Sequence, residues 1–221
     1  MRKTRLYSQH PLQIDTDYPA YVSCGVCCIM MALHAFRGVH TSLGMEKQLY
    51  SSWHCHATPG ILGSTIAHVL ATFLLDVKLV HESPALLENR DRNYPFGAEY
   101  LPTGEPYFPP EIHERILAEH HSYITREDST FMLETCVTIT PDVIRAELEQ
   151  NRLVISQRLI PDGEGGRAMH WMLIYGYQND AFLIRDPLQG SISMTDDVLA
   201  GLIDTPFGAS YISVGERSDK A

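Results

Sequence analysis

Three residues far apart in the chain have the side chains of a thiol-based active site, and the first is Cys24. It opens an apolar stretch, CGVCCIMMALHAF, that is typical of a buried helix, and Ser23 and Gly38 are residue types favoured at helix ends. A thiol in the first turn of a helix lies near unpaired backbone N–H groups, which stabilise a thiolate. We therefore predict that Cys24 is a nucleophile and that Gly25 lets a substrate approach the backbone closely. The competing interpretation is an ordinary core cysteine.

The other two residues are His170 and Asp186, at the two ends of a predicted β-hairpin, HWMLIYGYQNDAFLIRDP. In a hairpin, the start of the first strand and the end of the second lie at the same edge of the sheet, so these side chains should meet. The carboxylate can then orient the imidazole, which acts as the base for a nucleophile. Taken singly, a buried structural histidine and an Asp-Pro turn are the ordinary alternatives.

The elements that must position these residues come in the order helices first, strands second. That order predicts an α+β fold, with N-terminal helices packed on a C-terminal antiparallel sheet. Ser23, Thr41 or Ser42, and Ser64 or Thr65 are the expected N-caps of the first three helices. The later expected elements are strands at 77–80, 153–159, 170–177, 181–185 and 209–214 and helices at 110–120, 141–151 and 196–203.

The chain is predicted to form a single domain, residues 1–221, with an insertion or lid at about 82–139. Within it, residues 93–110 hold five prolines and five aromatic residues, so they cannot form a regular helix or a central strand. Loops on a rigid scaffold often select the substrate, and this segment is the candidate for that role. Plain surface elaboration is the alternative.

Composition excludes several kinds of partner. The formal net charge is −10, from 17 basic and 27 acidic side chains, so nucleic acid is not an expected partner. The N-terminal residues lack the apolar stretch of a signal peptide, and the most apolar stretch, Val26 to Phe36, is too short to cross a bilayer. A cytoplasmic protein without membrane insertion is the expectation.

Cysteine usage bears on metal binding. Five cysteines without a secretion signal indicate free thiols. The groups Cys24-x-x-Cys27-Cys28 and His54-Cys55-His56 could supply zinc ligands, but no second CxxC pair accompanies the first. We therefore expect no metal and no cofactor, and a metal-binding or interaction module without catalysis stays as an alternative.

The candidate catalytic residues Cys24, His170 and Asp186 lie in stretches that resemble those of a known family. SCGVCCIMMALHAFRG resembles the nucleophile helix of the bacteriocin leader-processing (double-glycine) peptidases, within the papain-like cysteine peptidase superfamily. GILGSTIAHVLATFLLDVKLV resembles the helix and strand that follow there, and the hairpin resembles their His-strand and Asp-Pro turn. The resemblance covers about residues 18–81 and 140–214, and it implies a papain-like fold with a Cys24, His170, Asp186 triad.

The resemblance breaks at one position. That family usually has a Gln six residues before the cysteine as an oxyanion-hole donor, and this chain has Tyr18 there, with Gln13 and Gln9 further upstream. Tyr18 is the expected donor, with Gln13 as the alternative, beside the Cys24 backbone N–H.

The implied activity is hydrolysis of a peptide or other amide bond through a Cys24 thioester. Relatives of this fold also include acyltransferases and amidases, so acyl transfer with the same triad is the alternative. The expected substrate is a peptide, amide or thioester.

Overall fold

The computed structural model describes residues 23–55, 60–82, 110–128, 130–135, 137–161, 167–203 and 210–217. The helices are α1 (Cys24–Arg37), α2 (Leu43–Trp53), α3 (Gly63–Thr72), α5 (Pro110–Ile124), α6 (Pro141–Glu149) and α7 (Asp196–Ile203). The strands are β1 (Leu75–His81), β2 (Met132–Thr135), β3 (Leu153–Pro161), β4 (Arg167–Gln178), β5 (Ala181–Asp186), β6 (Gly190–Met194) and β7 (Ser210–Glu216).

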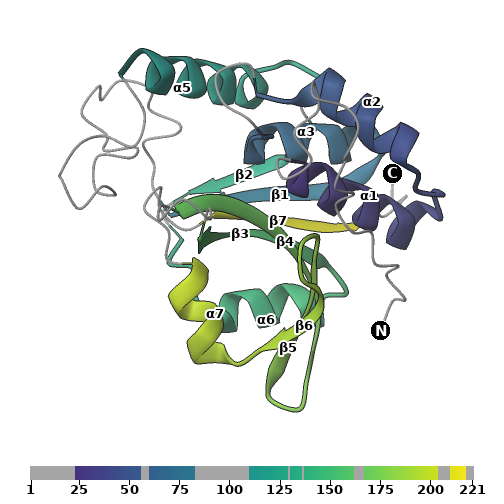
Figure 1. The fold of residues 1–221 in the computed structure, drawn as a ribbon, viewed down its shortest axis with the longest axis vertical. Coiled ribbons are helices and arrows are strands. Elements are labelled where there is room, and N and C mark those ends of the chain that lie inside the picture. Colours follow the sequence, from purple (N-terminus) through teal and green to yellow (C-terminus); the bar gives the residue numbers. More distant parts are fainter. Residues whose placement is uncertain are drawn as a thin grey trace.

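The strands form one seven-stranded sheet in the order β2-β1-β7-β3-β4-β5-β6. Helices α1, α2, α3 and α5 lie on one side of it and α6 and α7 on the other (Figure 1). The predicted α+β class is confirmed. The sheet is not wholly antiparallel, however, because β2 pairs with β1 in parallel. A parallel pair needs a long crossover, and the chain between β1 and β2 includes α5.

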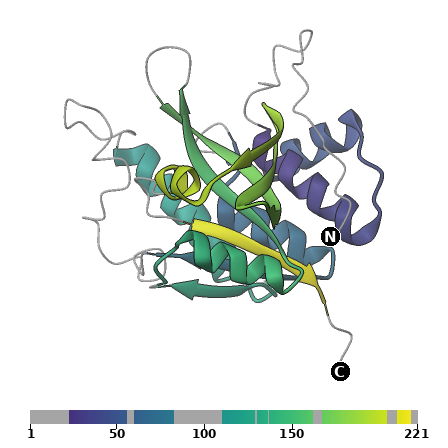
Figure 2. The same ribbon diagram turned by 90° about the horizontal axis from the view of Figure 1, so that it is seen from below.

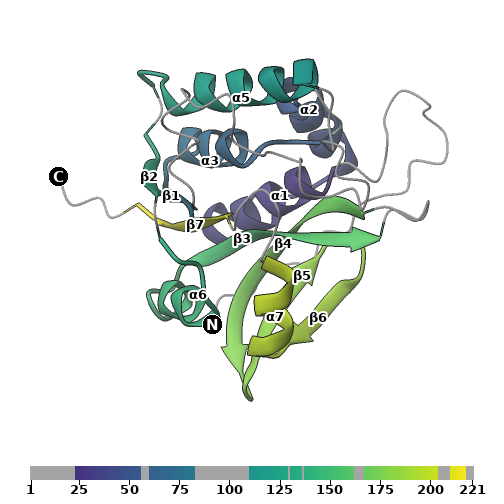
Figure 3. The ribbon, with the colours of Figure 1, turned by 90° about the vertical axis from the view of Figure 1, so that its left-hand side faces the viewer.

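The sheet separates two hydrophobic cores because successive side chains of each strand face opposite sides. On β4, Trp171 and Leu173 join the core under α1 and α3, while Met172 and Ile174 join the core beside α6 and α7. Figure 3 shows α5, α3 and α1 together on the first side, and Figure 2 shows α6 alongside β7 on the second. In the part of the chain described, no helix is long and apolar enough to cross a membrane.

Helix α1 forms where the sequence predicts it, and Gly38 ends it in the left-handed region, with φ 64°. Ser23 occupies the N-cap position, but its predicted capping role is wrong. Its hydroxyl donates to the buried Glu46 carboxylate at 2.5 Å and makes no cap hydrogen bond. The first turn of α1 is thereby tied to α2.

The caps of the next two helices differ. Ser42 caps α2 as predicted, since its Oγ accepts from the Met45 N–H at 3.2 Å. Helix α3 instead begins at Gly63, and its N-cap Leu62 has no side-chain cap. The predicted Ser64 or Thr65 cap is wrong because both residues lie inside the helix and are buried.

The hairpin of β4 and β5 also forms as predicted. Asn179 and Asp180, with φ of 53° and 56°, make the two-residue turn that suits a twisted hairpin. The register shifts between Ile174 and Gly176, which marks a β-bulge, and a bulge bends its strand.

The segment 82–139 contributes two described elements to the fold. Helix α5 packs on α3, where the Ser64 hydroxyl and the His120 Nδ1 lie 2.8 Å apart, and β2 extends the sheet. The proline-rich residues from 93 to 109 lie outside the described residues, so a lid stays a prediction.

Candidate active site

The nucleophile candidate is the first residue of α1. Cys24 is 5% exposed, and the backbone N–H of Trp171 donates to its sulfur at 3.4 Å. Cys24 and the beginning of β4 therefore touch across 147 positions of sequence. The sulfur therefore lies at the N-terminal end of α1, where the first backbone N–H groups of a helix have no intrahelical partner.

Gly25 has a different explanation from the predicted one. A Cβ at Gly25 would lie 2.1 Å from Cγ2 of Ile61 and 3.0 Å from the Trp171 ring. Trp171 is itself fixed, because its indole N–H donates to the Ile61 carbonyl at 3.0 Å. The space beside Gly25 is filled by the protein, so the glycine is required for internal packing and the prediction of substrate approach there is wrong.

His170 lies on β4 and is 1% exposed. Its Nε2 is 2.9 Å from Oδ1 of Asp186, which leaves Nδ1 for the Cys24 thiol. Burial lowers the pKa of the imidazole, but hydrogen bonds to Asp186 and Cys24 outweigh burial and raise the pKa of His170 to about 9. The protonated imidazole is therefore the stable form at neutral pH.

Asp186 ends β5 and is fully buried. Besides His170, its Oδ1 accepts from the backbone N–H groups of Leu188 at 2.8 Å and Gln189 at 3.0 Å. Burial raises the pKa of this carboxyl group, yet its hydrogen bond with His170 and the nearby charges outweigh burial, and the pKa falls to about 2. The Asp-Pro turn thus fixes an ionised carboxylate at the end of the strand.

The second carboxylate oxygen has a partner that the sequence did not suggest. The guanidinium of Arg158, on β3, donates to Oδ2 of Asp186 at 2.5 Å, and Arg158 is 5% exposed. Arg158 is also the register partner of His170 across β3 and β4. One sequence signal was available. In the strand LVISQR, the arginine shares a face with Val154 and Ser156, which are apolar and small.

The two other thiols of α1, those of Cys27 and Cys28, differ from Cys24 in their surroundings. Cys27 and Cys28 are fully buried, and burial raises the pKa of each well above its usual value. The Cys27 sulfur lies 3.8 Å from the Glu46 carboxylate, which disfavours a thiolate further. Both have the properties of unreactive core thiols.

The oxyanion-hole prediction has no counterpart in the described structure. Tyr18, Gln13 and Gln9 lie outside the described residues. The Tyr18 role and its Gln13 alternative stay predictions.

The potential metal ligands are dispersed. Cys27 faces Glu46 of α2, whereas the Cys55 sulfur lies 3.4 Å from a carboxylate oxygen of Glu119 on α5. Within the described ranges, no group of three or more His, Cys, Asp or Glu side chains is arranged to hold a metal ion. His56 and Cys136 lie outside those ranges.

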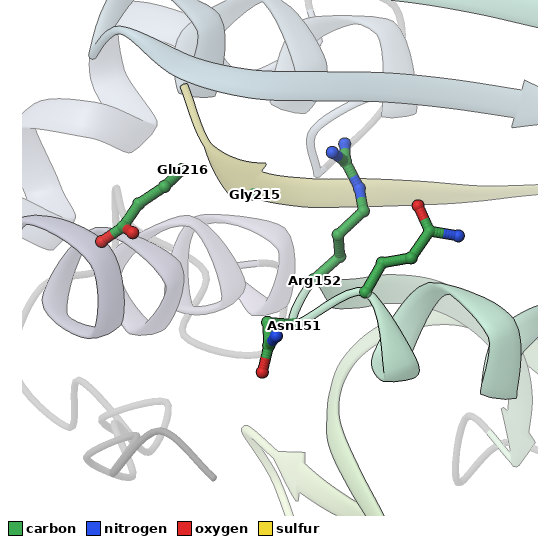
Figure 4. A pocket seen from close by; sticks show the side chains of 5 residues that line it. Asn151, Arg152, Gly215 and Glu216 are labelled. Atoms are coloured by element: carbon green, nitrogen blue, oxygen red, sulfur yellow. The ribbon is translucent and has the colours of Figure 1, made fainter. Parts of the chain in front are cut away.

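A cavity of about 270 Å³ lies elsewhere, at the turn between α6 and β3 and the end of β7 (Figure 4). Gln150, Asn151, Arg152, Gly215 and Glu216 line it. Arg152 is engaged with Asp76, Ser213 and Glu147, so the cavity has no free guanidinium to offer a ligand. It contains none of the three predicted site residues.

Comparisons with known proteins identify no family for this chain. No protein-family model matches it, and no curated protein matches it by sequence. Among solved structures, it is similar to a protein described as a C39-like peptidase from Bacillus anthracis. The match has a TM-score of 0.41 and 12% identity over 98% of this chain and 96% of that one.

Proposed function

We propose that this protein is a cysteine-nucleophile hydrolase that cleaves a peptide or other amide bond through a thioester at Cys24. One observation carries the proposal: Cys24, His170 and Asp186 form a continuous buried chain. His170 has one ring nitrogen on the Asp186 carboxylate at 2.9 Å and a hydrogen bond to the Cys24 thiol. Thiol, imidazole and carboxylate in this order are the parts of a nucleophilic triad.

In the proposed reaction, the Cys24 proton already resides on His170, whose protonated form is stable at neutral pH, and the Cys24 thiolate attacks the carbonyl carbon of the substrate. The tetrahedral intermediate collapses as the C–N bond breaks, and the imidazolium gives its proton to the leaving amine. Water then attacks the thioester, with His170 taking its proton. The C–S bond breaks, the acid leaves, and the pair of Cys24 thiolate and His170 imidazolium is restored.

Asp186 has two roles in this scheme. Its hydrogen bond at Nε2 selects the tautomer that presents Nδ1 to the thiol, and its charge stabilises the imidazolium formed in each half of the cycle. The fold supports both roles because the Leu188 and Gln189 N–H groups hold the carboxylate in place.

The test uses an activated ester, which needs no knowledge of the natural substrate. The protein is mixed with p-nitrophenyl acetate, and the acetylated residue is identified by peptide mass mapping. We expect a burst of p-nitrophenol and an acetyl group on Cys24. Cys24→Ser should lower the burst rate by about 10³-fold or more, since a serine there is a much weaker nucleophile near neutral pH.

Cys28→Ser is the matched control. It changes another buried thiol of α1, and within the described residues the hydrogen-bond partners of His170 are Cys24 and Asp186, not Cys28. It should leave the burst intact. Acetylation at Cys55 or at a lysine, with Cys24 unmodified, would sink the proposal. A library of fluorogenic peptides, assayed with the wild-type protein and Cys24→Ser, then tests amide cleavage directly.

A further inference from the structure

Arg158 is a buried cation placed directly behind the proposed triad. Its side chain is 7% exposed and that of Asp186 is 0% exposed, and the two are joined by one N–H···O bond of 2.5 Å. Arg158 also lies opposite His170 in the register of β3 and β4. An arginine is rarely buried unless its charge is paired, so this placement requires an explanation.

The two oxygens of Asp186 are held differently. Oδ1 accepts from His170, Leu188 and Gln189, all between 2.8 and 3.0 Å. Oδ2 has Arg158 as its donor, and no other donor to Oδ2 is found among the described residues. Arg158 at Oδ2 thus acts together with the donors at Oδ1 to fix the rotation of the carboxylate about its Cβ–Cγ bond, and that rotation sets where Oδ1 meets the imidazole.

The charges of the site give a second reason for a buried arginine beside Asp186. When the thiol has passed its proton to His170, Cys24 and Asp186 are negative and His170 is positive. Without Arg158 this buried group would have a net charge of −1, and with Arg158 it is neutral.

We infer that Arg158 is a positioning residue that orients the Asp186 carboxylate toward His170 and balances its charge, and this inference rests on the proposed function of the site. The charged and titratable groups around the pair of Asp186 and His170 are Arg158 from β3 and Cys24 and Cys28 from α1. Arg158 is the permanent cation of this set.

A double-mutant cycle tests the charge balance without any catalytic measurement. Asp186→Asn leaves Arg158 buried without its counter-charge, and Arg158→Met leaves Oδ2 without its donor. The double variant removes both charges. We expect Asp186→Asn to lower Tm by about 5–10 °C and the double variant to regain at least half of that loss, as expected when a buried unpaired charge is removed.

Arg152→Met in the same cycle with Asp186→Asn is the matched control. Arg152 is also a largely buried arginine, next to the start of β3, but its partners are Asp76, Glu147 and Ser213. Its effect on Tm should add to that of Asp186→Asn. An additive Arg158 cycle refutes the charge-balance role. If Arg158→Met alone does not fold, the double variant is compared with Asp186→Asn instead, and a double variant that is no more stable than Asp186→Asn refutes the role.

The charge balance has a further readout in the pKa of His170, and the positioning has one in the burst rate. The pKa of His170, followed by NMR of ¹³C-labelled histidine, should rise by about half a unit or more in Arg158→Met, because a nearby cation is lost, and fall in Asp186→Asn. The burst rate with p-nitrophenyl acetate should fall about 10- to 100-fold in Arg158→Met, the equivalent of one charge-assisted hydrogen bond. Arg158→Lys should recover part of it.

A role confined to folding predicts an unchanged His170 pKa and no rescue by lysine, and that result would overturn the inference. The two proposals fail separately. A wild-type protein that forms no acyl-enzyme at Cys24 refutes the proposed function, whereas the Tm cycle and the His170 titration report on Arg158 alone.

Discussion

Two buried carboxylates of this protein have much in common. Asp186 and Glu147 are each less than 5% exposed, each contacts an arginine, and each has a pKa below its ordinary value despite burial. They differ in their other partners. Glu147 is held by Lys78 and by the hydroxyls of Tyr211 and Ser213, none of which changes charge near neutral pH.

Asp186 shares its charge with His170, whose proton can move. The Glu147 cluster therefore joins α6 to β1 and β7 as a fixed support, while the Asp186 cluster can respond to a change of protonation in its neighbour. Two buried carboxylates with similar charge environments can thus differ in function according to whether one partner is titratable.

The largest effect that separates the two clusters is on acylation. His170→Gln removes the proposed acid–base group, so the burst rate with p-nitrophenyl acetate should fall by about 10²–10⁴-fold, the usual contribution of such a group. The fold should be retained, as judged by circular dichroism. Glu147→Gln should leave the burst rate of the folded protein unchanged. A burst lost equally in both variants would erase the distinction.

The next largest expected effect is on how the free energy of unfolding depends on pH. The pKa of His170 is about 9 in the folded protein and near 6.5 in an unfolded chain, so its contribution is fully present below pH 6.5 and is lost as pH rises toward 9. The free energy of unfolding should fall by up to about 3 kcal/mol over this range.

Urea unfolding at pH values from 6 to 9.5 measures this fall. His170→Gln should flatten the curve, and Glu147→Gln should keep the wild-type slope, because the lowered pKa of Glu147 affects stability only in acid. A wild-type curve that is flat between pH 6.5 and 9 would contradict the raised pKa of His170.

A smaller effect is expected from Glu147→Gln itself. The amide leaves Lys78 and Arg152 without their shared counter-charge, but these side chains are 20% and 13% exposed and keep contacts with Glu134 and Asp76. We expect a loss of about 2 kcal/mol, below the loss typical of a fully buried pair. Urea unfolding at pH 7 measures it, and a loss near zero would mean that the cluster is not a support.

The smallest effect concerns the helix that carries Glu147. Thr140 caps α6, since its hydroxyl accepts from the Val143 N–H at 3.4 Å. Thr140→Ala should lower stability by about 1 kcal/mol with no change in the burst rate. Thr140→Ser, which keeps the cap, is the control and should behave as the wild type.

Sequence was most informative where the signal is local. The start and end of α1 follow from its apolar stretch and from Gly38, and the hairpin follows from alternation around Asn179-Asp180. Because hairpin geometry alone brings its two ends together, the contact of His170 with Asp186 could be predicted from spacing.

Contacts between distant elements could not be predicted in this way. The pairing of Ser23 with Glu46, the filling of the Gly25 space by Ile61 and the contact of Arg158 with Asp186 depend on how separate elements pack. A buried arginine has no periodic signature, and its partner is known only when the register of β3 and β4 is known. The parallel pairing of β2 was missed for the same reason, because it depends on the path of a long crossover.

The contact between Cys24 and Trp171 has a consequence for biosynthesis. A ribosome makes Cys24 long before it makes Trp171 on β4, which follows 147 residues later, and the turn that holds Asp186 is made later still. Contacts of such long range form late, because the intervening chain must first close its loop. The nascent chain therefore lacks both the contact of Cys24 with Trp171 and the pair of His170 with Asp186 until the strands that carry these residues have been made.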